Sequence, residues 1–304
     1  RRYMIRLFAS DMDGTLLSSS GTISRYTADS IRRLQTCGIE FIVNTGREYN
    51  GAKKELDAAG ISCDMICCSG ACTYDKYGNP SNIASLPKST AKKILEIFKK
   101  HGAYADIYTE QGKTSIEDRE RFLSYYHNEV FPSLKEENKV YYQTPGDFHK
   151  MASQVKFFES ADSLLGTPVP VYKISTTFHD SKKTVRLRQD VEAIGGLHIA
   201  STSPSNLEIT HEKAQKGYAL LQYARQKSID PSEILAIGDS ENDYSMLSLN
   251  LGSTVAMANA EPSIKRICRA ETLSNDEDGV AVLMEGLVTE RCFYEINRRY
   301  VFGL

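Results

Sequence analysis

Short apolar runs separated by polar turns organise the first 75 residues of the chain. The runs at 4–10 and 39–44 each have the length and apolar content of a buried strand. Between them, Ile31 and Leu34 share one face of an amphipathic segment that Gly38 ends. Because only short links join strand to helix and helix to strand, the pattern predicts parallel βαβ units.

The stretch 84–210 interrupts this alternation. It is dense in aromatic and charged residues, and its apolar positions follow no regular strand–helix order. A strand-like run lies at 171–177, and a helical segment lies at 183–194. We therefore expect an inserted α+β domain here.

The strand–helix alternation resumes after the insertion. It predicts a helix at 217–226 and strands at 234–237 and 254–257. The expected fold class is thus α/β. A Rossmann-like parallel-sheet core comprises residues 1–83 and 211–304, and the α+β domain at 84–210 is inserted into it.

Composition narrows the class of protein and of partner. A chain of 304 residues and 34.0 kDa exceeds the usual single domain, which favours two domains. The net charge is −2 and the chain has no basic block, so nucleic acid and anionic membranes are excluded as main partners. No apolar run approaches the ~18 residues of a membrane span. We expect a cytoplasmic protein, a monomer or a weak homo-oligomer, acting on a small molecule.

Seven cysteines raise the question of a zinc site. Four of them cluster as Cys-x3-Cys-Cys-x3-Cys, at Cys63, Cys67, Cys68 and Cys72. No second Cys/His pair lies at a finger-like distance, and part of the cluster is in an apolar, strand-like run. This placement favours buried, reduced thiols over a metal site.

The candidate chemistry lies where three apolar strands end. The polar residues at these ends are Asp11 and Asp13, then Thr45, Gly46 and Arg47, and finally Asp239, Asn242 and Asp243. Because the carboxyl ends of parallel strands meet at one edge of a sheet, the three groups are expected to converge on one site. Asp11 and Asp13 are close enough to repel each other unless a cation or a shared proton intervenes. Such a pair suits a metal-assisted nucleophile with an acid/base partner.

Each motif taken alone has a simpler interpretation. Acidic turns after strands commonly cap helices, which applies to Asp11 or Asp13 and to the turn at 239–243. Thr45 and Gly46 offer a hydroxyl and an accessible backbone N–H to a phosphate oxygen, but Thr-Gly turns are common. A single lysine such as Lys216 is usually exposed to solvent, and Lys213 competes with it for any role. The shared sheet edge is what favours the functional interpretation.

These residues, in this order, resemble the haloacid dehalogenase-like superfamily of aspartate-nucleophile phosphohydrolases. The motifs that carry the resemblance are Asp11-Met12-Asp13-Gly14-Thr15, Asn44-Thr45-Gly46-Arg47, Lys216-Gly217 and Gly238-Asp239-Ser240-Glu241-Asn242-Asp243. The Thr-Gly-Arg triplet, the position of the insertion and Ala256-Met257-Ala258-Asn259-Ala260 are similar to the Cof-type subfamily.

The resemblance implies a role for each motif. Asp11 is the nucleophile that forms an aspartyl-phosphate, and Asp13 is the general acid and base. Phosphate and substrate are held by Met12, Thr45, Gly46, Arg47, Lys216 and Asn242. Mg²⁺ is held by Asp11, Asp13 through its main-chain carbonyl, Asp239 and Asp243. The insertion is a mobile cap that closes over the site and contacts the leaving group.

Two positions depart from the Cof-type pattern. Ser69-Gly70-Ala71 replaces the usual Asn-Gly-Ala, so the contact made by that amide is in question. Gln215 replaces the serine before Lys216, which leaves the lysine intact. The implied activity is a Mg²⁺-dependent phosphatase on a small phosphomonoester, such as a sugar, pyridoxal, flavin or nucleotide phosphate. A phosphotransferase or mutase on the same scaffold and a non-catalytic metabolite-binding protein are the alternatives.

Overall fold

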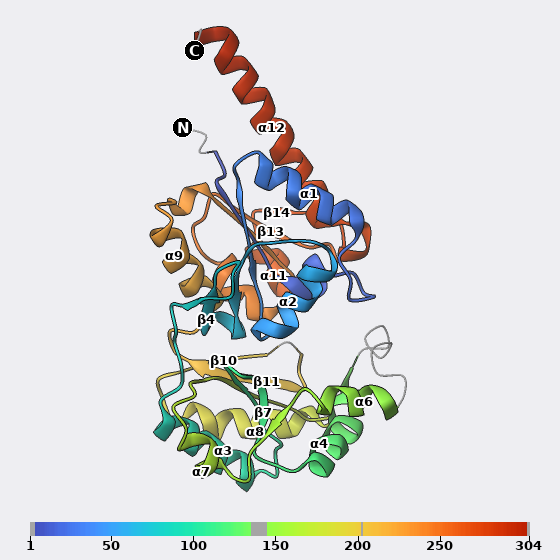
Figure 1. Cartoon of the computed structure of the whole chain (residues 1–304), viewed down its shortest axis with the longest axis vertical. Helices are drawn as coiled ribbons and strands as arrows, with labels where there is room; N and C mark the ends of the chain where they lie inside the picture. The colour runs from blue at the N-terminus through green and yellow to red at the C-terminus, as the bar shows by residue number, and fades with distance from the viewer. Residues whose placement is uncertain (1–3, 135–144, 202, 303–304) are drawn as a thin grey trace.

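The chain folds around two β-sheets, one below the other in the view of Figure 1. The structure is a computed structural model and describes residues 4–134, 145–201 and 203–302. One sheet has eight strands and the other has six, and the chain passes from the first to the second and back again. The eight-stranded sheet belongs to the core, and the six-stranded sheet belongs to the inserted cap.

The core sheet is mostly parallel. Its strand order is β14-β13-β12-β1-β2-β3-β4-β5. The strands are β1 (Leu7–Ser10), β2 (Glu40–Asn44), β3 (Asp64–Cys67), β4 (Cys72–Tyr74), β5 (Pro80–Ser81), β12 (Ile234–Gly238), β13 (Ser253–Ala256) and β14 (Ala270–Glu271). The neighbouring strands from β14 to β3 pair in parallel, and β4 and β5 pair antiparallel. Every residue of β1 and β12 is buried, as expected for central strands covered by helices on both faces.

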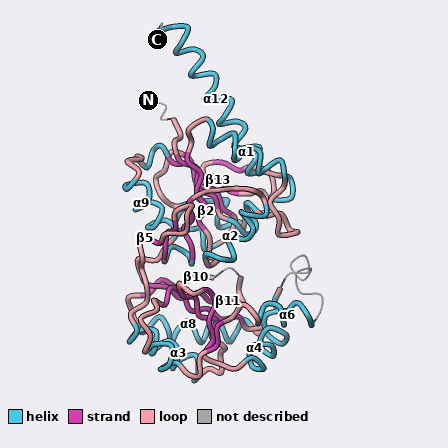
Figure 2. Tube along the Cα trace, in the orientation of Figure 1, coloured by secondary structure: helices cyan, strands magenta, loops and turns pink. Residues whose placement is uncertain are grey.

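Helices cover this sheet on both sides (Figure 2). They are α1 (Arg25–Thr36), α2 (Tyr49–Ala58), α9 (Lys216–Gln226), α10 (Tyr244–Leu247), α11 (Pro262–Ile267) and α12 (Gly279–Phe302). Ser24 caps α1 by accepting a hydrogen bond from the N–H of Thr27 at 3.0 Å. The first part of α12 packs on α1, and its last turns extend away from the core at the end opposite to the cap.

The cap is a six-stranded sheet with three of its helices, Lys88–Lys100, Ala161–Leu165 and Ser181–Glu192, packed on one face. Its strand order is β10-β11-β9-β6-β7-β8, antiparallel except for the parallel pair β7 and β8. The strands are β6 (Asp106–Thr109), β7 (Gly112–Ser115), β8 (Lys156–Phe157), β9 (Val171–Thr177), β10 (Leu197–Ala200) and β11 (Asn206–His211). The helices are α3 (Lys88–Lys100), α4 (Arg119–Tyr125), α5 (Phe131–Ser133), α6 (Pro145–Ala152), α7 (Ala161–Leu165) and α8 (Ser181–Glu192).

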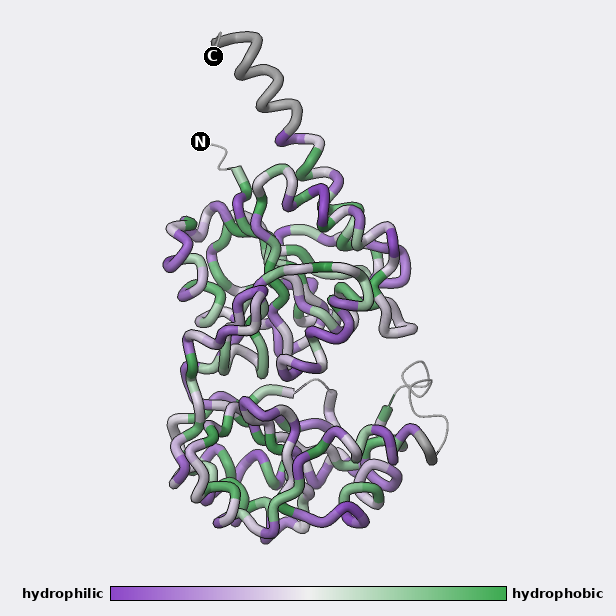
Figure 3. Tube along the Cα trace, viewed as in Figure 1, coloured by the Kyte–Doolittle hydropathy of each residue, from purple (hydrophilic) through white to green (hydrophobic). Residues whose placement is uncertain are grey.

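The two faces of the cap sheet differ in polarity. Apolar side chains such as Ile107, Ile174 and Ile209 pack against α3, α7 and α8. The opposite face is turned toward the core and carries charged side chains, including Lys173 and Glu208. Figure 3 shows that apolar and polar residues also alternate along the helices, as expected for helices with one buried face. The cap therefore places a polar surface over the edge where the core strands end.

The structure confirms the α/β class with a parallel core and an inserted cap. The first predicted strand is shorter than expected, beginning at Leu7, and Lys216 is the first residue of α9 rather than the residue before it. The alternation did not predict the antiparallel pair β4 and β5. These strands exist because the turn at Cys68–Gly70 reverses the chain directly after β3.

The clustered cysteines lie inside the core, as predicted. Cys63, Cys67, Cys68 and Cys72 are buried and have free thiols. Burial raises the pKa of Cys63 and Cys68 to about 12, so these thiols stay protonated at neutral pH. The side chain of Cys292 lies outside the described residues.

Candidate active site

Three adjacent parallel strands bring the predicted residues together. In the sheet, β1 lies between β12 and β2. Asp11 directly follows β1, Thr45 follows β2 and Asp239 follows β12. The N–H of Asp11 donates to the carbonyl of Ile237 at 3.0 Å, which ties the end of β1 to the end of β12. The convergence predicted from the sequence is therefore the arrangement in the structure.

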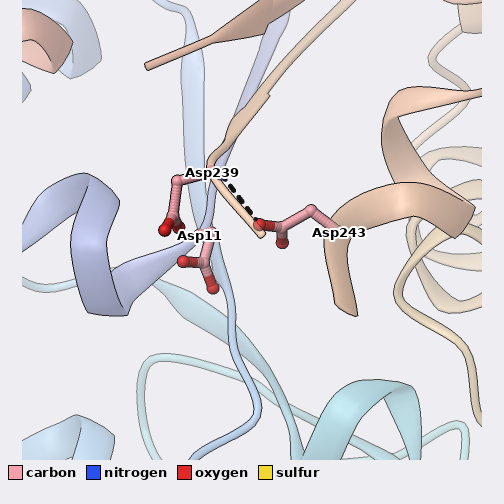
Figure 4. A group of neighbouring side chains, drawn as sticks. All are labelled: Asp11, Asp239 and Asp243. Atoms are coloured by element: carbon pink, nitrogen blue, oxygen red, sulfur yellow. Dashed lines mark hydrogen bonds between the residues drawn. The ribbon is translucent and has the colours of Figure 1, made fainter. Parts of the chain in front are cut away.

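Three carboxylates form the centre of the site (Figure 4). Asp11, Asp239 and Asp243 each place an oxygen within 4.8 Å of the others. Asp243 is oriented by the backbone, since its Oδ2 accepts from the N–H groups of Asp239 at 3.0 Å and Ser240 at 3.2 Å. Thr15 donates its hydroxyl to Oδ1 of Asp239 at 3.0 Å. The carboxylates of Asp239 and Asp243 are thus oriented by hydrogen bonds from neighbouring groups.

A glycine lets the turn after β1 pass close to Asp239. Gly14 has a φ of +75°, a conformation that side chains other than glycine disfavour. A Cβ at this position would lie 2.5 Å from Oδ2 of Asp239. The turn Met12–Leu16 therefore needs glycine for both its backbone conformation and its proximity to the carboxylate.

Lys216 is the cation among these carboxylates. Its Nζ lies 2.5 Å from Oδ1 of Asp11 and 2.7 Å from Oδ1 of Asp243, and its side chain is fully buried. It also lies 3.5 Å from Oδ1 of Asn242. It reaches the site from the first position of α9, which follows β11 after a link at residues 212–215. Lys216 compensates for one of the three carboxylates around it, so the cluster retains excess negative charge.

The excess negative charge shifts the pKa values of the groups in this cluster. Burial raises the pKa of Asp11, and the nearby Asp243 raises it further, against the opposing effect of Lys216. Burial, followed by Asp11 and Asp243, raises the pKa of Asp239 well above its usual range. Burial lowers the pKa of Lys216, but the two carboxylates outweigh it and the net shift is upward. A hard divalent cation would relieve this repulsion, and three adjacent carboxylates with no soft donor fit Mg²⁺.

Asp13 lies outside the carboxylate cluster. Its side chain is 58 % exposed, on the side of the turn that faces Arg47. The guanidinium of Arg47 donates from Nε to Oδ2 of Asp13 at 2.8 Å and from Nη2 to Oδ1 at 2.6 Å. Nη1 of Arg47 lies 3.7 Å from Glu55. The sequence placed Arg47 among the groups that hold phosphate, and the structure places its guanidinium on Asp13.

The loop after β2 supplies the uncharged candidates for phosphate binding. Thr45 is buried, and its hydroxyl oxygen accepts from the N–H of Arg47 at 3.1 Å. Its carbonyl accepts from the N–H of Ser69 at 3.0 Å, so the turn after β3 supports this loop. Met12 is buried at the start of the turn after Asp11. The predicted residues therefore lie at the ends of β1, β2 and β12 and at the start of α9.

Three polar residues near the site were given no role in the sequence analysis. Thr15 belongs to the first motif and contacts Asp239. Lys173 and Glu208 come from the cap and reach the loop after β2 and the turn after β3. The one charged residue in a strand-like run, as in Val171–Thr177, is the signal that could have identified Lys173.

Comparison with known proteins agrees with this geometry. Residues 8–284 match the model of a family described as haloacid dehalogenase-like hydrolases. The chain belongs to this family. It is 33% identical to the phosphatase YwpJ of Bacillus subtilis, over 93% of this chain and 100% of that protein. It is 28% identical to the 5-amino-6-(5-phospho-D-ribitylamino)uracil phosphatase YwtE of the same organism, over 94% and 99%.

A solved structure shares the whole architecture. A haloacid dehalogenase-like hydrolase from B. subtilis superposes with a TM-score of 0.79 at 29% identity, covering 92% of this chain and 99% of that one. The family resemblance carried by the four motifs is therefore confirmed. Among the helices in the described part of the chain, none is long and apolar enough to cross a bilayer.

Proposed function

We propose that this hydrolase is a Mg²⁺-dependent phosphatase that cleaves small phosphomonoesters through an aspartyl-phosphate on Asp11. The observation that carries the proposal is the buried carboxylate of Asp11, held by Lys216 at 2.5 Å and lying beside Asp239 and Asp243. Lys216 fixes the orientation of Asp11 and offers a positive charge where phosphoryl oxygens would collect.

The proposed reaction has two steps that share one proton carrier. A carboxylate oxygen of Asp11 bonds to phosphorus as the ester P–O bond breaks, and Asp13 gives its proton to the departing oxygen. In the second step Asp13 takes a proton from the water that attacks the aspartyl-phosphate, which releases phosphate and restores Asp11. The exposed position of Asp13 supports this role, because the leaving group and the water must both reach it.

The carboxylates offer a place for the metal. Asp11, Asp239 and Asp243 would hold Mg²⁺, with the main-chain carbonyl of Asp13 as a further ligand by resemblance to the family. When bound, the ion supplies charge neutralisation between an anionic nucleophile and an anionic substrate. Thr45, Gly46, Met12 and Asn242 would then bind the phosphoryl oxygens through hydroxyl, amide and backbone N–H groups.

We propose that the cap, at residues 84–210, determines which substrate is used. Every residue given a chemical role lies outside this segment, and the polar face of its sheet is turned to the core. YwtE is named for a ribitylamino-uracil phosphate, which supports a small phosphorylated metabolite as the substrate class. The leaving group stays open among sugar, pyridoxal, flavin and nucleotide phosphates.

A phosphate-release assay over a panel of these phosphomonoesters tests the proposal. We expect steady release with Mg²⁺ and no added acceptor, no release after chelation, and recovery on adding Mg²⁺ back. The Asp11→Asn variant is the control for contaminating phosphatases. Phosphoryl transfer that requires a sugar acceptor would identify a phosphotransferase instead, and ligand binding without turnover would identify a metabolite-binding protein.

A further inference from the structure

A buried ion pair of the cap reaches into the core beside the proposed phosphate site. Lys173 on β9 and Glu208 on β11 lie on adjacent antiparallel strands, two register positions apart. Their side chains are 3% and 10% exposed, and Nζ of Lys173 lies 3.0 Å from Oε1 of Glu208. Nζ of Lys173 also lies 4.5 Å from the centre of the Tyr108 ring. The pair is therefore held from several sides within the cap.

Both members of the pair also contact the core. Nζ of Lys173 donates to the carbonyl oxygen of Gly46 at 2.6 Å. Oε2 of Glu208 accepts from the hydroxyl of Ser69 at 2.8 Å. We refer to Gly46, Ser69, Lys173 and Glu208 as the cap–core clasp. Gly46 belongs to the loop that would bind phosphate, so the clasp joins the cap directly to that loop.

The core side of the clasp has little freedom to shift independently. Ser69 adopts a left-handed conformation, with φ of 60° and ψ of 30°. Its N–H donates to the carbonyl of Thr45, and the N–H of Cys68 donates to the carbonyl of Arg47 at 2.8 Å. A strained turn persists only where its surroundings hold it. The bond from Ser69 to Glu208 is one such restraint.

The cap side shows a local irregularity at the same place. Tyr108 pairs with Lys173 and Thr109 with Val171, so Tyr172 has no partner in the register. Irregularities of this kind redirect side chains and are frequent next to active sites. Tyr172 packs into the core cluster while Lys173 reaches Gly46. A buried ion pair contributes little net stability, so stability alone does not account for the pair of Lys173 and Glu208. Its hydrogen bonds to Gly46 and Ser69 indicate instead that the pair positions the core loop.

We propose that Lys173 and Glu208 are positioning residues that hold the Thr45–Gly46 loop in its phosphate-binding conformation when the cap lies against the core. The inference rests on the proposed function of that loop. It makes phosphate affinity depend on cap residues that do not touch the phosphate. It also assigns a contact to Ser69, the position where this chain departs from the Cof-type asparagine.

The test compares clasp variants by the inhibition constant of inorganic phosphate, by kcat and KM, and by thermal unfolding. Lys173→Met and Ser69→Ala each remove one hydrogen bond between cap and core. We expect phosphate to inhibit the first variant about tenfold and the second about threefold more weakly. Ser69→Asn should restore the affinity that Ser69→Ala loses, because asparagine tolerates the left-handed conformation and its amide can donate to Glu208. Lys92→Gln is the control, since its ion pair with Asp162 joins α3 to α7 on the far face of the cap.

The outcomes separate the clasp from the phosphatase proposal. A wild-type protein that neither hydrolyses phosphomonoesters nor binds phosphate would overturn both. An active wild-type protein whose Lys173→Met and Ser69→Ala variants have lower melting temperatures but unchanged phosphate inhibition would overturn the clasp alone. If Lys173→Met does not fold, Ser69→Ala and Ser69→Asn decide the question. These two variants change only the hydrogen bond from residue 69 to Glu208 and leave the buried ion pair intact.

Discussion

Arg47 holds the carboxylate of Asp13 through two hydrogen bonds, from Nε to Oδ2 at 2.8 Å and from Nη2 to Oδ1 at 2.6 Å. A guanidinium fork fixes the plane of a carboxylate as well as its position. The pairing keeps Asp13 apart from the three acids around Lys216 and turned to the open side of the site. This orientation is the one that a proton carrier between leaving group and water would need.

Replacing Arg47 with lysine should therefore impair catalysis more than binding. Lysine keeps the charge but lacks the planar fork, so Asp13 loses its fixed orientation. We expect kcat to fall about tenfold with little change in KM, measured by steady-state phosphate release. Lys53→Gln serves as the control, because Lys53 pairs with Asp57 on α2, away from Asp11. A large rise in KM at unchanged kcat would instead place Arg47 on the substrate, as the sequence analysis expected.

The Asp11→Asn variant should lose turnover while keeping its fold. The amide is almost isosteric with the carboxylate but is a very poor nucleophile, so we expect a loss on the order of a thousandfold or more. Removing one of three crowded carboxylates should also leave the melting temperature of the metal-free protein equal or higher. Phosphate release and thermal unfolding measure the two effects. Turnover within severalfold of wild type would remove Asp11 from the nucleophile role.

The centre of the site was predictable from the sequence because each of its residues follows a strand that the sequence pattern reveals. Asp11, Thr45 and Asp239 follow apolar runs, and parallel strands place their carboxyl ends at one edge. That argument needs only that the strands run parallel in one sheet, and the βα alternation predicts such a sheet. Lys216 was identified through its Lys-Gly motif, which lies a few residues after the strand Asn206–His211.

The clasp and the position of Arg47 were not predictable in this way. Lys173 meets Gly46 across 127 residues of sequence, and the contact exists only because the cap sheet docks over the core. Lys173 faces the core because it alternates with Ile174 along β9, but no periodicity reveals that it meets Gly46 there. Arg47 lies two residues after Thr45 in the sequence, yet whether it binds Asp13 or a phosphate depends on tertiary distances.

The metal-free protein should become less stable as pH rises from mildly acidic values. Burial and neighbouring acids raise the pKa of Asp239 and Asp11, so the folded state binds more protons than the unfolded state above the unfolded pKa of about 4. The free energy of unfolding therefore falls as pH rises through the window up to the folded pKa values, by at most about 1.4 kcal/mol per pH unit for each group.

Urea unfolding in the presence of a chelator, at pH 5 and pH 7.5, measures this dependence. Asp239→Asn should flatten the difference between the two pH values relative to wild type, because the variant has one carboxyl fewer to deprotonate. Mg²⁺ should raise the melting temperature of wild type at pH 7.5, since it binds the folded state alone. An equal pH dependence in wild type and Asp239→Asn would show that Asp239 does not carry the excess charge.

Gly14→Ala should disturb the metal site specifically. The new Cβ would meet Oδ2 of Asp239 at 2.5 Å, and the backbone would be held at a φ of +75°. We expect a loss of stability of about 1–3 kcal/mol from the backbone strain, together with a higher Mg²⁺ concentration for half-maximal activity because Asp239 must move. Gly102→Ala isolates the strain, since Gly102 has a φ of +63° with nothing within 4 Å of the added Cβ. That control should lose stability while its Mg²⁺ requirement stays at the wild-type value. A Gly14→Ala variant with the same Mg²⁺ requirement as Gly102→Ala would mean that Asp239 does not hold the ion.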